Sequence, residues 1–139
     1  MAKQPARLVW KGQAAISRMR AASSRGVERV ARAYIQECLH LVFDTPKTGR
    51  IYGGHQASAP GEPAASDKGT YVGSFKLETK ELRAGPVARV TNSSDHALKL
   101  EFGTVRMKPR PVMTPALRNM GQGAFRMYYN EWAAEFKKK

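Results

Sequence analysis

Apolar residues recur at intervals of three and four along residues 12–43, the spacing of one face of an amphipathic helix. The stripe consists of Ile16, Met19, Val27, Val30, Tyr34 and Cys38, widened by Ala31, Ile35 and Val42. Pro46 follows closely and ends the helical pattern. Residues 23–26 read Ser-Ser-Arg-Gly, and their low helix propensity predicts a kink or break there. We therefore predict one long N-terminal helix with a weak point near its middle.

The last part of the chain, residues 114–136, shows the same helical spacing. Thr114 suits the N-cap position and Pro115 the first helical position. The stripe is interrupted by two glycines and contains Leu117, Met120, Phe125, Tyr128, Trp132 and Phe136. An aromatic row beside basic residues can stack on nucleic-acid bases, but at helical spacing we expect it to form core.

Between the helices, residues 74–82 and 87–92 alternate apolar and polar positions, as half-buried strands do. The residues between them, Arg-Ala-Gly-Pro at 83–86, favour a turn. Together they predict an antiparallel hairpin.

A short helix is expected after the hairpin, running to Leu100. Ser94 or Asp95 is placed to cap it. Ala97 and Leu98 are expected to face inward from this helix.

Residues 44–70 show no periodicity and consist largely of Gly, Pro, Ser and Ala. So long a structureless segment is uncommon inside a compact domain. We interpret it as an extended arm or long hairpin that becomes ordered on a neighbouring subunit. Residues 1–10 are predicted to form a second, basic arm, and the whole of 1–139 is predicted to be a single domain.

The segment KLEFGTVRMKPRPVMTPAL, residues 99–117, suits neither a helix nor a central strand. Gly103 permits backbone angles closed to other residues, and Pro109, Pro111 and Pro115 hold the chain extended. We expect this segment to lie over the surface and to fix the direction of the last helix.

The net charge is +13, from 24 Lys and Arg against 11 Asp and Glu. Such an excess favours acidic partners, including nucleic acid and anionic protein surfaces. The candidate contacts with such partners are the cations of the first helix and of the proline-rich segment: Arg18, Arg25, Arg29, Arg32, Arg106, Lys108 and Arg110.

Catalytic and metal chemistry find little support in the sequence. Cys38 sits among apolar residues and is expected to be a buried thiol, and the three histidines lack the spacing of a zinc site. We expect no cofactor, no metal and no enzymatic activity. There is no apolar run of the roughly 20 residues that span a bilayer and no secretion signal near the N-terminus, so we expect a chain made in the cytoplasm.

Two motifs resemble a known family. The run LEFGTVRMKPRPVMTPAL, and before it TPKTGRIYGGHQASAPGEPAASDKGTYVGSF, are similar in composition and order to signatures of small tail-component proteins of tailed bacteriophages. They cover residues 45–118. Tyr71 stands where the family usually carries leucine, and Val112 where it carries phenylalanine, and both substitutions keep an apolar anchor.

The resemblance implies a small α+β subunit with a long N-terminal helix, an antiparallel sheet and a C-terminal helix. It implies a tail-completion or head–tail joining protein, a virion component of the neck assembled in the bacterial cytoplasm. It implies a homo-oligomeric ring, hexameric or dodecameric, between the connector and the tail terminator or tail tube, and contact with packaged double-stranded DNA. The expected subunit-interface residues are Ile51, Tyr52, Ala57, Pro60, Glu101, Phe102, Gly103, Thr104, Met107 and Pro111. The alternative is a basic nucleic-acid-binding protein, for which the charge alone argues.

Overall fold

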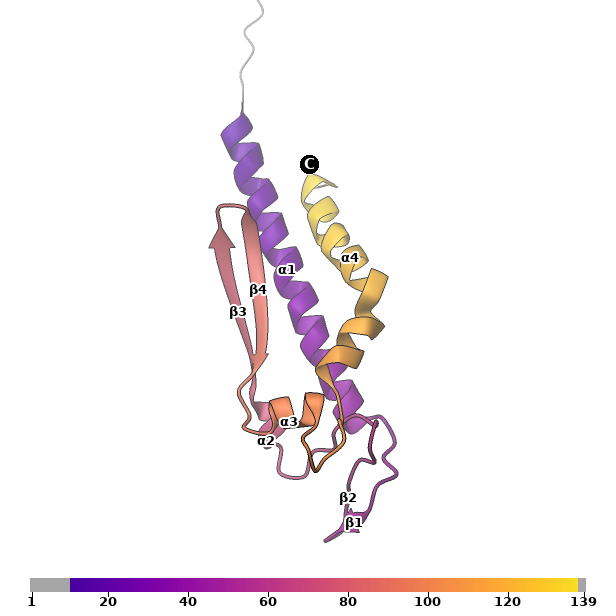
Figure 1. Ribbon diagram of the computed structural model, residues 1–139. Coiled ribbons are helices and arrows are strands. Elements are labelled where there is room, and N and C mark those ends of the chain that lie inside the picture. The colour runs from indigo at the N-terminus through magenta and orange to yellow at the C-terminus, as the bar shows by residue number, and fades with distance from the viewer. Residues whose placement is uncertain (1–10, 138–139) are drawn as a thin grey trace, which may run out of the picture.

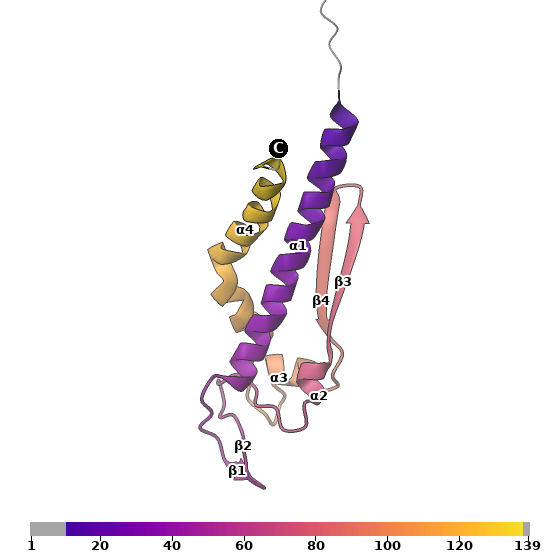
Figure 2. The ribbon, with the colours of Figure 1, turned by 180° about the vertical axis from the view of Figure 1, so that it is seen from behind.

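The structure is a computed structural model that describes residues 11–137, so the predicted basic arm at 1–10 lies outside the described residues. In chain order its elements are α1 (Gly12–Phe43), β1 (Ile51–Tyr52), β2 (His55–Gln56), α2 (Thr70–Gly73), β3 (Phe75–Leu82), β4 (Gly85–Asn92), α3 (Ala97–Phe102) and α4 (Met113–Lys137). The α+β fold predicted from the sequence is confirmed, with two separate two-stranded antiparallel sheets. Helix α1 runs through the middle, with the β3–β4 hairpin along one side and α4 along the other (Figures 1 and 2).

The predicted kink in α1 is wrong, because the helix runs unbroken from residue 12 to residue 43. Its weak helix formers lie where α4 crosses. A Cβ atom on the buried Gly26 would lie 2.8 Å from Cδ2 of Tyr128, and the Tyr128 hydroxyl donates a hydrogen bond to Ser23 Oγ at 3.1 Å. Glycine at this position therefore serves close helix packing.

The β3–β4 hairpin is confirmed in a register that pairs Leu77 with Val90 and Phe75 with Asn92. The turn is narrower than expected, because Gly85 and Pro86 already belong to β4. Leu77 and Val90 are half-buried, whereas Glu78 and Arg89, which are paired opposite each other, are exposed. One face of the hairpin therefore packs on the protein and the other is solvated.

Helix α4 forms as predicted, but its aromatic face is not core. Leu117 is 66% exposed and Phe125 71% exposed. The backbone of Gly121 (φ 32°, ψ −122°) is not helical, so the helix is kinked there. The apolar stripe before Gly121 therefore does not continue on the same face of the helix after it. Of the predicted stripe, Tyr128 is the residue that meets α1 at Gly26.

The N-terminal turns of α1 are also more exposed than predicted. Ile16 and Met19 belong to its apolar stripe but are exposed. The reason is visible in Figure 1, where this end of α1 extends past both the hairpin and α4.

The core is small and lies at the C-terminal end of α1. It consists of Cys38, Leu41, Val42, Ala64, Tyr71, Val112 and Ala116. Tyr71 and Val112, the two departures from the family pattern, are therefore both buried anchors. The largest fully buried side chains are those of Val112 and Cys38, so one chain buries little apolar volume by itself.

Helix α3 contributes to this core through Leu100, while Leu98 is exposed, contrary to prediction. A helix of only six residues has room for one inward stripe, which Ala97 and Leu100 occupy. Ser94 or Asp95 was expected as the N-cap of α3, but His96 occupies that position. Ser94 lies two residues earlier, and its Oγ accepts the backbone N–H of His96 at 3.3 Å.

Candidate functional site

The carboxylate of Glu101 organises the proline-rich segment. Its Oε2 accepts the backbone N–H groups of Val112 at 2.9 Å and Met113 at 3.0 Å, and its Oε1 accepts that of Thr114 at 2.7 Å. These are donors of the first turn of α4, which have no partner within the helix itself. The predicted N-cap at Thr114 is therefore wrong, since Thr114 already lies inside the helix and Glu101 caps it from α3.

The ionised form of Glu101 is favoured by this arrangement. Partial burial alone would raise the pKa of Glu101, but the hydrogen bonds from Thr114, Val112 and Met113 outweigh it and hold the pKa below its usual value. A carboxylate at a helix N-terminus also meets the positive end of the helix dipole. Glu101 therefore acts as a charged clamp between α3 and α4.

Gly103 and the loop after it close a tight turn beside Glu101. Gly103 has φ 76°, and a Cβ atom there would lie 2.6 Å from the carbonyl oxygen of Met107. Thr104 and Met107 form an isolated bridge, with the Thr104 N–H donating to Met107 O at 2.7 Å. Val105 at the tip of this loop is fully exposed.

Arg110 and Pro109 attach the arm to this segment. The Arg110 backbone N–H donates to Leu100 O at 2.7 Å and its Nε donates to Ser58 O at 3.0 Å, while Gly61 N–H donates to Pro109 O at 2.9 Å. Together with the Glu101 cap, these bonds define what we call the hub, residues 100–114. The hub joins α3, α4 and the arm.

The arm is thus partly ordered on its own chain, which corrects the expectation that all of 44–70 awaits a neighbour. Ser58 and Ala64 are buried, and the Glu62 carboxylate accepts the backbone N–H groups of Thr48 and Ala59. Small buried residues and hydrogen bonds to the Glu62 carboxylate therefore hold the base of the arm, although the sequence of the arm has no apolar periodicity. The β1–β2 hairpin alone projects, with Ile51 64% and Tyr52 60% exposed (Figure 1).

The expected interface residues divide into two groups in the structure. Ile51, Tyr52, Pro60, Phe102 and Thr104 are exposed, and so are available to a partner. Ala57, Glu101, Gly103, Met107 and Pro111 are half-buried. Of these, Glu101 and Gly103 build the hub, so their demonstrated contacts are internal, and a role at an interface stays a prediction.

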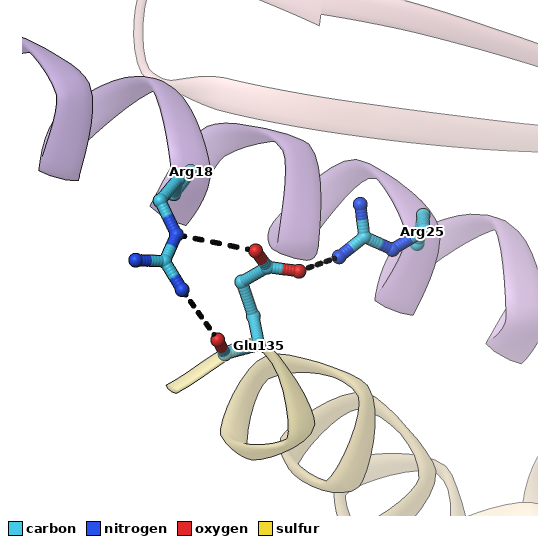
Figure 3. Close-up of polar contacts among 3 residues, drawn as sticks. All are labelled: Arg18, Arg25 and Glu135. Carbon is cyan, nitrogen blue, oxygen red and sulfur yellow. Dashed lines mark hydrogen bonds and ion pairs between the residues drawn. The ribbon is translucent and has the colours of Figure 1, made fainter. Parts of the chain in front are cut away.

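The expected cationic contacts on α1 are exposed but engaged in ion pairs. Figure 3 shows Glu135 of α4 between Arg18 (Nε to Oε1, 3.2 Å) and Arg25 (Nη2 to Oε2, 2.6 Å). Arg29 pairs with Glu131, and Arg32 with Glu28 one turn away on its own helix. Arg18, Arg25 and Arg29 therefore join α1 to α4 along one side, whereas the Arg32 pair lies within α1. Of the loop cations, Arg106 and Lys108 are exposed, whereas Arg110 turns inward to the arm.

On the other side of the α1–α4 contact lies an apolar trough that the sequence analysis missed. It has a volume of about 700 Å³. Helices α1 and α4 and strand β4 line it through Val27, Val30, Tyr34, Ala88, Val90, Leu117, Met120, Ala124 and Tyr128. A second hollow of about 500 Å³ lies beside α3, and four residues line both hollows: Tyr34, Val90, Met113 and Leu117.

A row of aromatic rings runs along the C-terminal half of α4, and it includes the residues that directly follow the trough-lining Ala124 and Tyr128. Phe125, Tyr129, Trp132 and Phe136 contact one another in sequence, with ring centroids 6.4, 6.4 and 4.6 Å apart. At 100° per residue the row lies about a quarter turn from the positions that face α1. Met127 lies on the opposite flank, in the cleft with the arginines of α1. The aromatic row therefore lies on the flank of α4 that faces away from the arginine cleft.

The buried ionisable groups near the hub are structural. Burial raises the pKa of the Cys38 thiol to about 11, and it also raises the pKa of the Tyr34 hydroxyl, which donates to Met113 O at 2.9 Å. Among residues 11–137, no group of three His, Cys, Asp or Glu side chains is placed to hold a metal ion. Within the same range, no helix combines the length and apolarity needed to cross a membrane.

The exposed surface is large for the size of the chain. The accessible surface is 10,688 Å², whereas a compact monomer of 15.4 kDa exposes about 7,200 Å². Even with full exposure of the twelve residues outside 11–137, worth about 1,900 Å², an excess of about 1,600 Å² remains. The chain is therefore more extended than a compact monomer of its mass.

Comparisons of this protein with protein-family models, with curated proteins and with solved structures found no match. The resemblance to phage tail-component proteins therefore rests on the two sequence motifs, and it stays a hypothesis about function.

Proposed function

We propose that this chain is a structural, ring-forming subunit at the head–tail junction of a tailed bacteriophage, a tail-completion or head–tail joining component. The observation that carries the proposal is the excess of exposed surface, much of it apolar, on a chain whose own core is small. A subunit that completes its burial in an assembly has this character, as large exposed apolar patches mark interaction sites. The chain's work would be recognition and not chemistry.

The motif residues support the same proposal. The Glu-Phe-Gly-Thr motif and the prolines after it build the hub, in which Glu101 caps α4 and Gly103 makes the turn. The hub fixes the direction of α4, which carries five exposed large hydrophobic residues, and of the arm, which exposes Ile51 and Tyr52. Because the motif residues fix how α4 and the arm are held, and both would contact neighbours, they suit a subunit of a symmetric ring.

The proposed partners are copies of this chain, the connector or adaptor ring above, the tail terminator or tail tube below, and the DNA that passes between them. The net charge of +13 suits contact with acidic rings or with DNA. No cofactor is proposed, and the proposed location is the neck of the virion.

The test uses the source phage with an amber codon in place of the Gln36 codon. Lysates from a non-suppressing host are compared by negative-stain electron microscopy with lysates from a suppressor host that inserts glutamine, the matched control. Filled heads beside separate tails support joining, and tails of irregular length support termination of tail growth. Normal infectious particles without suppression would overturn the proposal.

The alternative of a basic nucleic-acid-binding protein is favoured by charge alone. Four of its expected phosphate contacts, Arg18, Arg25, Arg29 and Arg32, are already paired with glutamates. If the purified chain bound duplex DNA with an affinity that fell steeply with salt, and the amber phage were normal, this alternative would replace the first.

A further inference from the structure

We propose that the apolar trough and the aromatic row receive the β1–β2 hairpin of a second copy of this chain, in a head-to-tail contact. The inference rests on the proposed assembly function and names its contact surfaces. The trough side is the acceptor, made by α1, β4 and α4, and the hairpin tip around Ile51 and Tyr52 is the donor.

The acceptor is suited to apolar side chains and not to a small polar ligand. Among its lining residues the polar groups are the hydroxyls of Tyr34 and Tyr128, and both already donate hydrogen bonds, to Met113 O and Ser23 Oγ. Small-molecule sites usually offer a few convergent polar groups that fix orientation. An open trough lined almost entirely by apolar side chains instead resembles the centre of a protein interface.

The donor is a preformed tip with its apolar residues outward. Ile51 pairs with Gln56 and Tyr52 with His55, joined by Gly53 and Gly54, which both have positive φ. Two such glycines suit the tight turn of a two-residue hairpin. Its base is held by hydrogen bonds between Gly49 N–H and Ala57 O and between Ala57 N–H and Arg50 O. Little ordering is then needed on binding, which favours affinity.

The contact has to be between copies. The hairpin projects at one end of the molecule, beyond the C-terminal end of α1, while the C-terminal half of α4, which carries the aromatic row, lies at the other end (Figures 1 and 2). A chain therefore cannot place its own hairpin on its own row. A contact between two different patches of identical chains is heterologous, and it gives a ring where the rotation between neighbours closes and an open filament where it does not.

Charge also favours the arm as the donor. A chain of net charge +13 repels its copies at most surfaces. Residues 44–70 instead balance three cations against three carboxylates: Lys47, Arg50 and Lys68 against Asp44, Glu62 and Asp67. The arm can therefore approach a basic neighbour without net repulsion, and Arg50, which lies 5.5 Å from the Tyr52 ring centre, can extend its cation–π contacts to the aromatic row.

Nucleic acid fits the aromatic row less well. A base-stacking platform needs cations beside the rings to hold phosphates. Residues 121–137 of α4, which carry the row, contain only two cations, Arg126 and Lys137, and of these only Arg126 lies beside a ring, three residues before Tyr129. Single-stranded DNA is nevertheless included in the test.

The test measures self-association of the purified full-length chain by sedimentation velocity. The donor variant is Ile51→Asp/Tyr52→Asp and the acceptor variant is Phe125→Glu/Tyr129→Glu; all four residues are exposed, so the fold of one chain should survive. Leu82→Asp, an exposed apolar residue at the tip of the β3–β4 hairpin, is the matched control. Circular dichroism and thermal unfolding check that each variant is folded.

We expect the wild-type chain and the Leu82→Asp control to form oligomers. Each site variant alone should be monomeric, with dissociation constants raised about ten- to a hundredfold by loss of the buried side chains. An equimolar mixture of donor and acceptor variants keeps one intact donor and one intact acceptor, so it should form a 1:1 dimer and stop there. That arrest identifies a head-to-tail contact.

Oligomers that persist in the donor or acceptor variant would overturn this inference and leave the proposed function standing, because other surfaces would then join the subunits. A wild-type chain that stays monomeric at every concentration would also overturn it. Association that appears only with single-stranded DNA, and is lost in the acceptor variant, would reassign the aromatic row to nucleic acid. The amber phage tests the proposed function independently of all three outcomes.

Discussion

Replacing Glu101 with alanine is expected to destabilise the protein by about 3 kcal/mol. Three backbone N–H groups lose their acceptor: those of Val112, Met113 and Thr114. Val112 is fully buried, so its orphaned N–H costs about 1–3 kcal/mol, whereas water can replace the carboxylate at the exposed Thr114. Loss of a helix cap by itself costs about 0.5–2 kcal/mol. The sum is a large fraction of the 5–15 kcal/mol that stabilises a typical domain.

Urea unfolding followed by circular dichroism at neutral pH measures this loss. Glu101→Gln keeps one acceptor oxygen without the charge, and it should lose about half as much. The exposed Glu78→Ala, on the solvated face of the hairpin, is the control and should change stability by less than about 0.5 kcal/mol. A loss below about 1 kcal/mol for Glu101→Ala would refute the assignment of Glu101 as the cap.

The same pair of proteins tests the charge of Glu101. Its pKa is lower in the folded chain than in the unfolded one. Its contribution is therefore fully present above the ordinary glutamate pKa of about 4.3 and is lost as the pH falls through the folded-state pKa. The stability difference between wild type and Glu101→Ala should shrink in acid, and a difference that is unchanged at low pH would contradict an ionised cap.

Three further predictions concern the contact between the helices and the core. Gly26→Ala should destabilise the protein by about 1–3 kcal/mol, as measured by thermal unfolding, because the new Cβ meets the Tyr128 ring. The control Gly123→Ala, with open space around residue 123, should instead stabilise the protein by up to about 1 kcal/mol. Equal effects of the two substitutions would contradict the packing argument. Cys38 is buried with a pKa raised to about 11, so at pH 8 it should react with a thiol reagent far more slowly in the folded protein than in denaturant. Glu135→Gln should cost about 1 kcal/mol at low ionic strength and less at high salt, because its partners are largely exposed; a loss that does not change with salt would show that the ion pairs are not its source.

The helices and the β3–β4 hairpin were predictable because each follows from local periodicity. Which face of each of these elements is buried was harder to predict. Residues 125–136 have the spacing of a core stripe, and that spacing cannot distinguish a face that its own chain covers from one that a partner covers. Which residues of α4 are buried depends on the non-helical backbone of Gly121 and on the contact of α4 with α1 at Gly26. Both are properties of the tertiary structure and not of the local sequence.

The turn within the hub was predictable from the sequence, but the helix cap was not. Gly103 and the prolines indicated a rigid turn, but the cap could not be deduced, because Glu101 reaches a helix that starts more than ten residues later and no local rule links the two. The anchoring of the arm escaped for a similar reason. It depends on small buried residues such as Ala64 and on backbone hydrogen bonds such as that from Gly61 to Pro109, which leave no hydrophobic pattern in the sequence.

The position of Val112 in the chain has a consequence for synthesis on the ribosome. The core at the end of α1 closes only when Val112 packs near Cys38 and the Tyr34 hydroxyl reaches Met113 O, a contact that spans 79 residues. Contacts of such long range slow folding, and chains emerge from the ribosome at about 5–20 residues per second. Helix α1 is therefore made first and has to wait several seconds, its apolar stripe uncovered, until most of the chain has emerged. The nascent chain is a natural client for chaperones during that interval.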